Sequence, residues 1–109
     1  MVSIPAHSPQ VCDRFHSAIE LIGKRWTGAI ISALLSGATR FCEIRESIPG
    51  ISDRLLTERL KELEDNGIVA RTVTDARPPQ VGYALTEKGA ALKTPLDAVG
   101  DWAATWTGA

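Results

Sequence analysis

Cysteine is scarce in this chain, and long apolar runs are missing. The two cysteines, Cys12 and Cys42, are too few for a disulfide scaffold and lack CxxC spacing. No run of about 18 apolar residues is present, so no membrane-spanning segment is expected. Residues 1–11 contain prolines and lack the apolar core of a secretory signal, which predicts a flexible N-terminal arm. Together these absences favour a reducing, cytoplasmic environment.

An excess of one charge is also missing, because 12 Lys and Arg residues face 13 Asp and Glu residues. A protein that coats nucleic acid nonspecifically needs excess cation to release counterions, so that class is disfavoured. A protein that binds a specific DNA sequence needs only a local cluster of basic side chains. With 109 residues in all and 44% hydrophobic content, residues 12–109 are expected to form one domain. A domain this small would gain stability from oligomerisation.

Catalytic and metal-binding patterns are absent as well. The chain has no nucleophile elbow, no phosphate-binding loop and no carboxylate pair in a credible frame, so an enzyme is not expected. Cys12, His16 and His7 offer at most three metal ligands, whereas structural zinc uses four. We therefore expect no metal and no cofactor.

A helix with clear start and stop signals is expected over Ser52 to Asn66. Ser52 is a typical N-cap, Asp53 adds favourable charge to the first turn, and Gly67 can adopt the left-handed conformation that ends a helix. Three leucines at helical spacing predict the buried stripe: Leu56, Leu60 and Leu63. Polar side chains on the opposite face can make hydrogen bonds outside the protein: Arg54, Thr57, Glu58 and Lys61.

Three further helical periods precede this segment, over residues 15–22, 26–35 and 41–48. The second is apolar on nearly all sides, which predicts a buried helix. Thr39 is the expected N-cap of the third, and Pro49-Gly50 forms the turn that follows it. Two helices joined by such a turn are typical of a helix-turn-helix.

After Gly67 the apolar period changes from helical to alternating, which predicts two strands, over residues 68–74 and 81–85. Two prolines stiffen the loop that connects these strands, so Arg77 is expected to be exposed at its tip. Helices are expected again over residues 86–93 and from Thr94, with Pro95 as the first residue of the last helix. This order of elements predicts an α+β domain built as a winged helix-turn-helix with additional terminal helices.

Four motifs, in the order expected, resemble the HxlR-type family of bacterial transcription regulators. They are ELIGKRWTGAIISALLSG, Arg40-Phe41 with Glu43-Ile44, ISDRLLTERLKELEDNGIV, and a pattern of paired prolines, Tyr83, Leu85-Thr86 and Gly89. The resemblance implies winged helix-turn-helix homodimers that bind pseudo-palindromic operators. Two departures lie outside the DNA-reading half: Asp13 stands where proline is common, and Lys24-Arg25 replaces Gly-Lys.

The resemblance implies that double-stranded DNA contacts the helix that begins at Ser52. It also implies contact with the wing, the hairpin formed by the two expected strands. The N-terminal part of such a helix lies nearest the base edges in the major groove. Arg77 is expected in the minor groove or on a phosphate, and Arg40 on a phosphate. The full set of expected DNA-binding residues is Arg40, Ser52, Asp53, Arg54, Thr57, Glu58, Lys61 and Arg77.

A homodimer is expected because the last helix carries a wide apolar stripe with little left to cover it within one chain. The resemblance likewise implies an interface of N-terminal and C-terminal helices. The expected interface residues are Phe15, Ile19, Ile22, Leu96, Val99, Trp102 and Trp106.

Cys12 is the expected sensor thiol, because a helix N-terminus lowers a thiol pKa and the resembled family includes thiol sensors of oxidants and electrophiles. Cys42 is expected to be structural, with a role as resolving partner left open. The predicted function is therefore a repressor-like regulator gated by thiol oxidation or a small electrophile. Two alternatives remain: a winged-helix module that binds proteins, and a regulator gated by a small molecule bound non-covalently between the terminal helices and the core.

Overall fold

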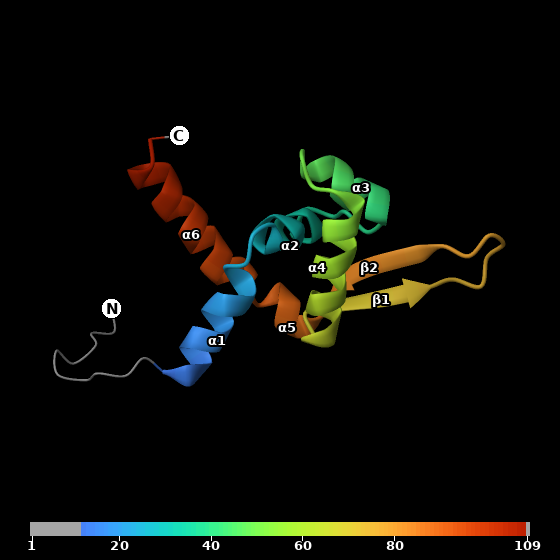
Figure 1. Ribbon diagram of the computed structural model, residues 1–109, viewed down its shortest axis with the longest axis horizontal. Coiled ribbons are helices and arrows are strands. Elements are labelled where there is room, and N and C mark those ends of the chain that lie inside the picture. The colour runs from blue at the N-terminus through green and yellow to red at the C-terminus, as the bar shows by residue number, and fades with distance from the viewer. Residues whose placement is uncertain (1–11, 109) are drawn as a thin grey trace.

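The computed structural model describes residues 12–108 and forms six helices and a two-stranded sheet there (Figure 1). In chain order these are α1 (Asp13–Ile22), α2 (Thr27–Leu35), α3 (Phe41–Ser47), α4 (Asp53–Asp65), β1 (Val69–Val73), β2 (Val81–Leu85), α5 (Glu87–Ala90) and α6 (Lys93–Trp106). This confirms the α+β winged helix-turn-helix with helices added at both ends. The arm expected over residues 1–11 lies outside the described residues.

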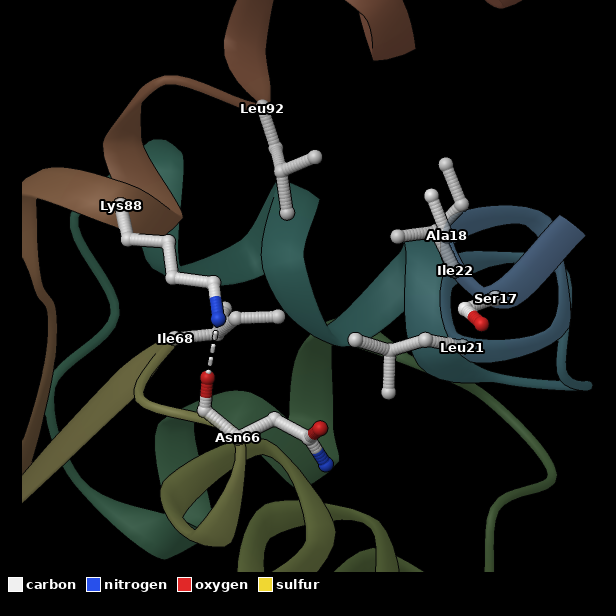
Figure 2. A pocket seen from close by; sticks show the side chains of 8 residues that line it. All are labelled: Ser17, Ala18, Leu21, Ile22, Asn66, Ile68, Lys88 and Leu92. Atoms are coloured by element: carbon white, nitrogen blue, oxygen red, sulfur yellow. Dashed lines mark hydrogen bonds between the residues drawn. The ribbon is translucent and has the colours of Figure 1, made fainter. Parts of the chain in front are cut away.

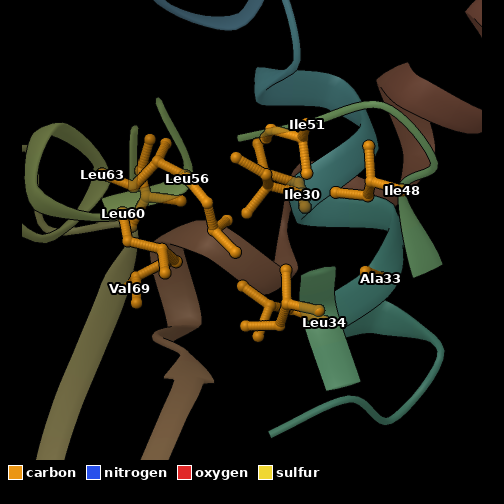
Figure 3. Packing of buried hydrophobic residues seen from close by; sticks show 12 residues of the cluster. Ile30, Ala33, Leu34, Ile48, Ile51, Leu56, Leu60, Leu63 and Val69 are labelled. Carbon is orange, nitrogen blue, oxygen red and sulfur yellow. The ribbon is translucent and has the colours of Figure 1, made fainter. Parts of the chain in front are cut away.

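The core forms where α2 meets α4 and the turns around α3 (Figure 3). Ile30 and Ile31 of α2 are fully buried, as the apolar character of this helix predicts. The leucine stripe of α4 packs into the same cluster, with Leu56, Leu60 and Leu63 all buried. Because the leucine stripe faces the core, the polar face of α4 points away from it.

The start and stop signals of α4 are confirmed. The Ser52 side chain accepts a hydrogen bond from the Leu55 backbone N–H at 3.1 Å, so it satisfies one of the free donors of the first turn. Gly67 follows the helix with a φ of +73°, a conformation that glycine adopts without steric cost. The helix therefore ends abruptly and the chain enters β1.

The hairpin forms the wing. Its strands are antiparallel, with Val69 opposite Leu85 and Val73 opposite Val81. At the far end the Thr74 N–H donates to the Gln80 carbonyl at 2.9 Å, which closes the loop. On the other edge of β2 the Tyr83 N–H donates to the Thr39 carbonyl at 2.7 Å. The segment before α3 thus holds the base of the wing against the helix-turn-helix.

Two predicted helix starts are wrong. The N-cap of α3 is Arg40, not Thr39, because the Glu43 carboxylate accepts from the backbone N–H groups of both residues at 3.0 Å. Thr94 does not cap α6, which begins at Lys93; Pro95 is its third residue. The first backbone N–H groups of a helix have no intrahelical acceptor, so proline at this position loses no hydrogen bond.

The short helix α5 is pressed against the turn between α4 and β1. A side chain at Gly89 would place its Cβ 2.2 Å from the Ile68 carbonyl oxygen, so only glycine permits this approach. Thr86 caps α5 by accepting from the Gly89 N–H, and its own N–H donates to the Ile68 carbonyl. This contact sets where α6 leaves the core. In Figure 1, α1 and α6 extend on the side of the molecule opposite the wing.

Candidate nucleic-acid interface

The solvent-facing row of α4 begins with Arg54, whose side chain is 90% exposed. Its Nε donates to Glu58 at 3.3 Å, a helical pair that is open to water and therefore weak. The Thr57 hydroxyl donates to the Asp53 carbonyl oxygen at 2.8 Å and so keeps its lone pairs available. The arrangement leaves the Arg54 guanidinium free to exchange Glu58 for an external acceptor.

Asp53 is paired across the turn of the helix-turn-helix. Arg45, in the last turn of α3, donates from Nη1 to the two Asp53 carboxylate oxygens at 3.1 and 3.3 Å. The same contact raises the pKa of the Arg45 guanidinium, so its charge is permanent. Sequence reasoning missed Arg45 as a candidate DNA contact, because its place beside Asp53 depends on how α3 and α4 pack.

Arg40 is tied to the wing. Its Nη2 donates to the side-chain oxygen of Gln80 at 3.0 Å, across 40 positions of sequence. Glu43 lies beside it at the start of α3, where the Thr39 and then the Arg40 backbone N–H groups lower the pKa of its carboxyl. Arg40 therefore joins the helix-turn-helix to the base of the wing loop, a position that sequence reasoning did not predict.

Arg77 lies in the exposed loop that connects the strands, as expected. The loop is held at its base by the Thr74 hydroxyl, which accepts from the Ala76 and Gln80 backbone N–H groups at 3.4 and 3.0 Å. A closed base and two prolines limit how far the Arg77 backbone can move.

Lys61 lies farther along α4 and faces a shallow groove between this helix and the wing, lined also by Arg71 and Tyr83. Lys61 donates to Asp65 at 3.0 Å, and this hydrogen bond raises the pKa of the lysine. Arg71 and Tyr83 pair directly across the two strands. Sequence reasoning missed Arg71 as a candidate phosphate contact, because its role depends on how the strand lies beside α4.

The opposite flank of α4 is fixed to the segment before α2. Lys24 donates to Glu62 at 2.8 Å, and Arg59 donates to Glu62 at 2.9 Å and to the Arg25 carbonyl at 3.0 Å. Lys24 contributes most to lowering the pKa of the Glu62 carboxyl. The Lys24 side chain and the Arg25 backbone carbonyl thus hold α4, and Glu62 is occupied with internal contacts.

The terminal helices expose apolar side chains that the single chain leaves uncovered. Phe15 of α1 is 60% exposed, and Trp102 and Trp106 of α6 are 62% and 73% exposed. Ile19 and Val99 are exposed beside them. Ile22 and Leu96 are half-buried, and Leu96 packs against the core. Neither α1 nor α6 contains a buried residue.

The two thiols lie far apart, with Cys12 directly before α1 and Cys42 in α3 (Figure 1). Both side chains are exposed. The backbone N–H groups of Phe15 and then Arg14 lower the pKa of the Cys12 thiol, in the direction expected for a helix N-terminus. Cys42 contributes nothing to the core, which contradicts the structural role expected for it.

The described part of the chain, residues 12–108, has neither a cluster of metal-ligating side chains nor a long apolar helix. No group of three or more His, Cys, Asp or Glu side chains there could hold a metal ion. Within the same residues, no helix is long and apolar enough to cross a membrane.

A helix-turn-helix followed by a basic wing defines a class of protein, the winged helix-turn-helix transcriptional regulators. The family model of the HxlR-like helix-turn-helix proteins matches residues 21–109. Two curated relatives come from Bacillus subtilis (strain 168). The regulator YodB is 50% identical over 93 residues, covering 85% of this chain and 83% of YodB. The regulator YvaP is 43% identical over 97 residues, covering 89% and 90% of the two chains.

Solved structures agree with the sequence relatives. Reduced YodB from B. subtilis superposes with a TM-score of 0.80 at 48% identity, covering 89% of this chain and 95% of that one. YodB has also been solved after diamide treatment and with bound quinone. The reduced form of the redox regulator HypR superposes with a TM-score of 0.80 at 35% identity, covering 85% and 92%. The chain belongs to the HxlR-like helix-turn-helix family of DNA-binding transcriptional regulators.

Proposed function

We propose that the chain acts in the cytoplasm as a homodimeric repressor that binds a pseudo-palindromic operator through α4 and the wing. The observation that carries this proposal is the solvent-facing row of α4, whose Arg54 side chain is 90% exposed and paired only with the exposed Glu58. An arginine here can exchange a weak internal pair for a bidentate contact with guanine.

The expected contacts divide by role. Arg54 and Thr57 face the base edges, whereas Ser52 caps the helix and Asp53 holds Arg45 toward the DNA. Arg40, Arg45 and Lys61 are phosphate contacts on either side of α4, and Arg77 reaches the minor groove from the wing. Glu58 orients Arg54 in the free protein and accepts from cytosine N4 in the complex. A local cluster of this kind suffices although the net charge of the chain is −1.

The dimer uses the uncovered faces of α1 and α6. Burying Phe15, Trp102 and Trp106 against a second copy would remove the most exposed aromatic side chains from water. The remaining interface residues continue the same faces: Ile19, Ile22, Leu96 and Val99. A closed two-fold dimer would present its two α4 helices to half-sites about 34–36 Å apart, one turn of DNA.

Cys12 is proposed as the thiol that gates operator binding. Its lowered pKa favours the thiolate, which is the form that attacks oxidants, quinones and other electrophiles. The residue precedes α1, so modification would act on the helix that also forms the dimer. YodB with bound quinone and after diamide treatment, and the redox regulator HypR, support this class of effector.

The test is binding of the full chain to a duplex that contains an inverted repeat from the DNA flanking its own gene. The control is a scrambled duplex of equal length and base composition. Tight binding of one dimer, with affinity that falls steeply and linearly on a log-log plot against salt, is expected. Equal affinity for both duplexes, or no salt dependence, would instead favour a module that binds proteins.

A further inference from the structure

A pocket of about 310 Å³ lies where α1 meets the end of α4 (Figure 2). Five apolar side chains, from α1 and from the residues just before β1 and α6, form most of its wall: Ala18, Leu21, Ile22, Ile68 and Leu92. Pockets for small ligands in proteins begin at about 300 Å³ and are mostly apolar. The pocket is partly open to solvent, so a small ligand would stay partly exposed. The space therefore suits a molecule with a single ring and a small substituent.

The pocket lies at a loosely packed joint. No residue of α1 is buried, and Leu21 is its one side chain that packs partly against the core. On the other wall, Ile68 is buried and follows the helix that faces DNA. A molecule in this pocket would touch both the proposed dimer helix and the end of the recognition helix. Filling the space would therefore change the preferred angle between them.

The polar groups at the edge of the pocket determine which ligand fits. The Lys88 amine donates to the Asn66 carbonyl oxygen at 2.7 Å and keeps two further N–H groups (Figure 2). The carbonyl groups at the end of α4 carry about half a negative charge, which offsets about half of the lysine charge. An anion would lose hydration on entering this mostly apolar pocket, which cancels most of what it gains from the lysine. A neutral molecule with an oxygen acceptor would gain a hydrogen bond and bury its ring.

We propose that this pocket binds a neutral, single-ring molecule with one carbonyl oxygen, which accepts from Lys88. Binding shifts α1 against α4 and so lowers operator affinity, without any reaction of Cys12. The effect on operator affinity rests on the proposed function, whereas the binding of the molecule in the pocket does not.

The experiment uses the full chain with ¹³C-labelled Ile and Leu methyl groups and acetophenone as the probe. A saturable titration of the Ile22, Ile68 and Leu92 methyl signals is expected, with weaker binding of benzoate. Lys88→Met keeps the apolar stem and should weaken acetophenone binding about two- to tenfold, the usual worth of one hydrogen bond. Lys93→Met, on α6 outside the pocket, is the matched control and should leave acetophenone binding unchanged.

Ala18→Phe should fill the pocket and abolish the titration, whereas Ala76→Phe in the exposed wing loop should not. Three results would overturn the site: no saturable shift, shifts that survive Ala18→Phe, or tighter binding of benzoate. Contacts between the pocket methyl groups and a tryptophan ring of a second copy would also overturn it, because the partner would then occupy the space.

The effect on operator affinity is measured separately, with and without acetophenone. Lower affinity in its presence is expected. Binding of acetophenone without change in operator affinity would overturn the regulatory claim alone. A chain that binds acetophenone but no operator duplex would overturn the proposed function and leave the site standing.

Discussion

Arg45 and Asp53 join the two helices of the helix-turn-helix, with the Arg45 Nη1 atom 3.1 Å from the nearer carboxylate oxygen of Asp53. Asp53 adds negative charge to the end of α4 that would approach DNA, which by charge alone would weaken binding. The pairing with Arg45 gives Asp53 a different role, because Asp53 then holds a cation at that end of α4. A carboxylate that is already paired with arginine repels phosphate less than a free one.

Replacing Arg45 by Gln should weaken operator binding and lower the slope of log affinity against log salt by about one, as expected for one lost phosphate contact. Arg14→Gln, the same change on exposed α1, is the control and should alter neither. Fluorescence anisotropy titrations at several salt concentrations measure both quantities. Asp53→Asn should also weaken binding; stronger binding would show that Asp53 acts only by repulsion.

Arg54→Ala should cost about 1–3 kcal/mol of operator binding, the usual worth of a bidentate base contact. Because the side chain is 90% exposed, the free energy of unfolding should not change. The measurement is an electrophoretic shift titration together with a urea unfolding curve. Equal affinity of mutant and wild type would remove Arg54 from the interface.

Ser52→Ala tests the capping role of the Ser52 hydroxyl. The Ser52 hydroxyl accepts from the Leu55 N–H, so its loss should reduce the free energy of unfolding by about 0.5–2 kcal/mol. Ser52→Asp keeps an acceptor and should restore stability. Denaturant unfolding of the three proteins decides this. Full stability of the alanine variant would contradict the cap.

Signals that act within a few residues were readable from the sequence, and those that depend on distant residues were not. Ser52 and Gly67 mark the two ends of α4 as predicted, because each acts on its own turn of chain. Thr39 has the same local signature but does not cap α3, because its backbone N–H and its hydroxyl both donate to the Glu43 carboxylate. The link between Arg40 and Gln80 spans 40 positions and exists only because the hairpin folds back beside α3.

Replacing both Trp102 and Trp106 by Ala should convert the protein to a monomer. Each tryptophan would bury about 150–250 Å² when covered, so their loss removes much of the apolar area of the interface. Sedimentation velocity measures the state of association, and circular dichroism checks that the chain stays folded. Because both side chains are exposed in one chain, the monomer should remain folded and bind its operator weakly. A stable dimer of the double variant would exclude α6 as the interface.

Cys12 should react faster than free cysteine with iodoacetamide at neutral pH. The backbone N–H groups of Phe15 and Arg14 lower the pKa of its thiol, so a larger fraction is thiolate at a given pH. The rate should rise with pH and level off at a lower pH than for free cysteine, because the thiolate is the reacting form. Mass spectrometry after brief alkylation gives the rates at Cys12 and Cys42 separately, and Cys12 is expected to be modified first. Diamide should then weaken operator binding of the wild type but not of Cys12→Ser, while Cys42→Ser serves as the matched control. If both serine variants still respond to diamide in the same way as the wild type, neither thiol alone carries the signal and the proposed gate at Cys12 is wrong.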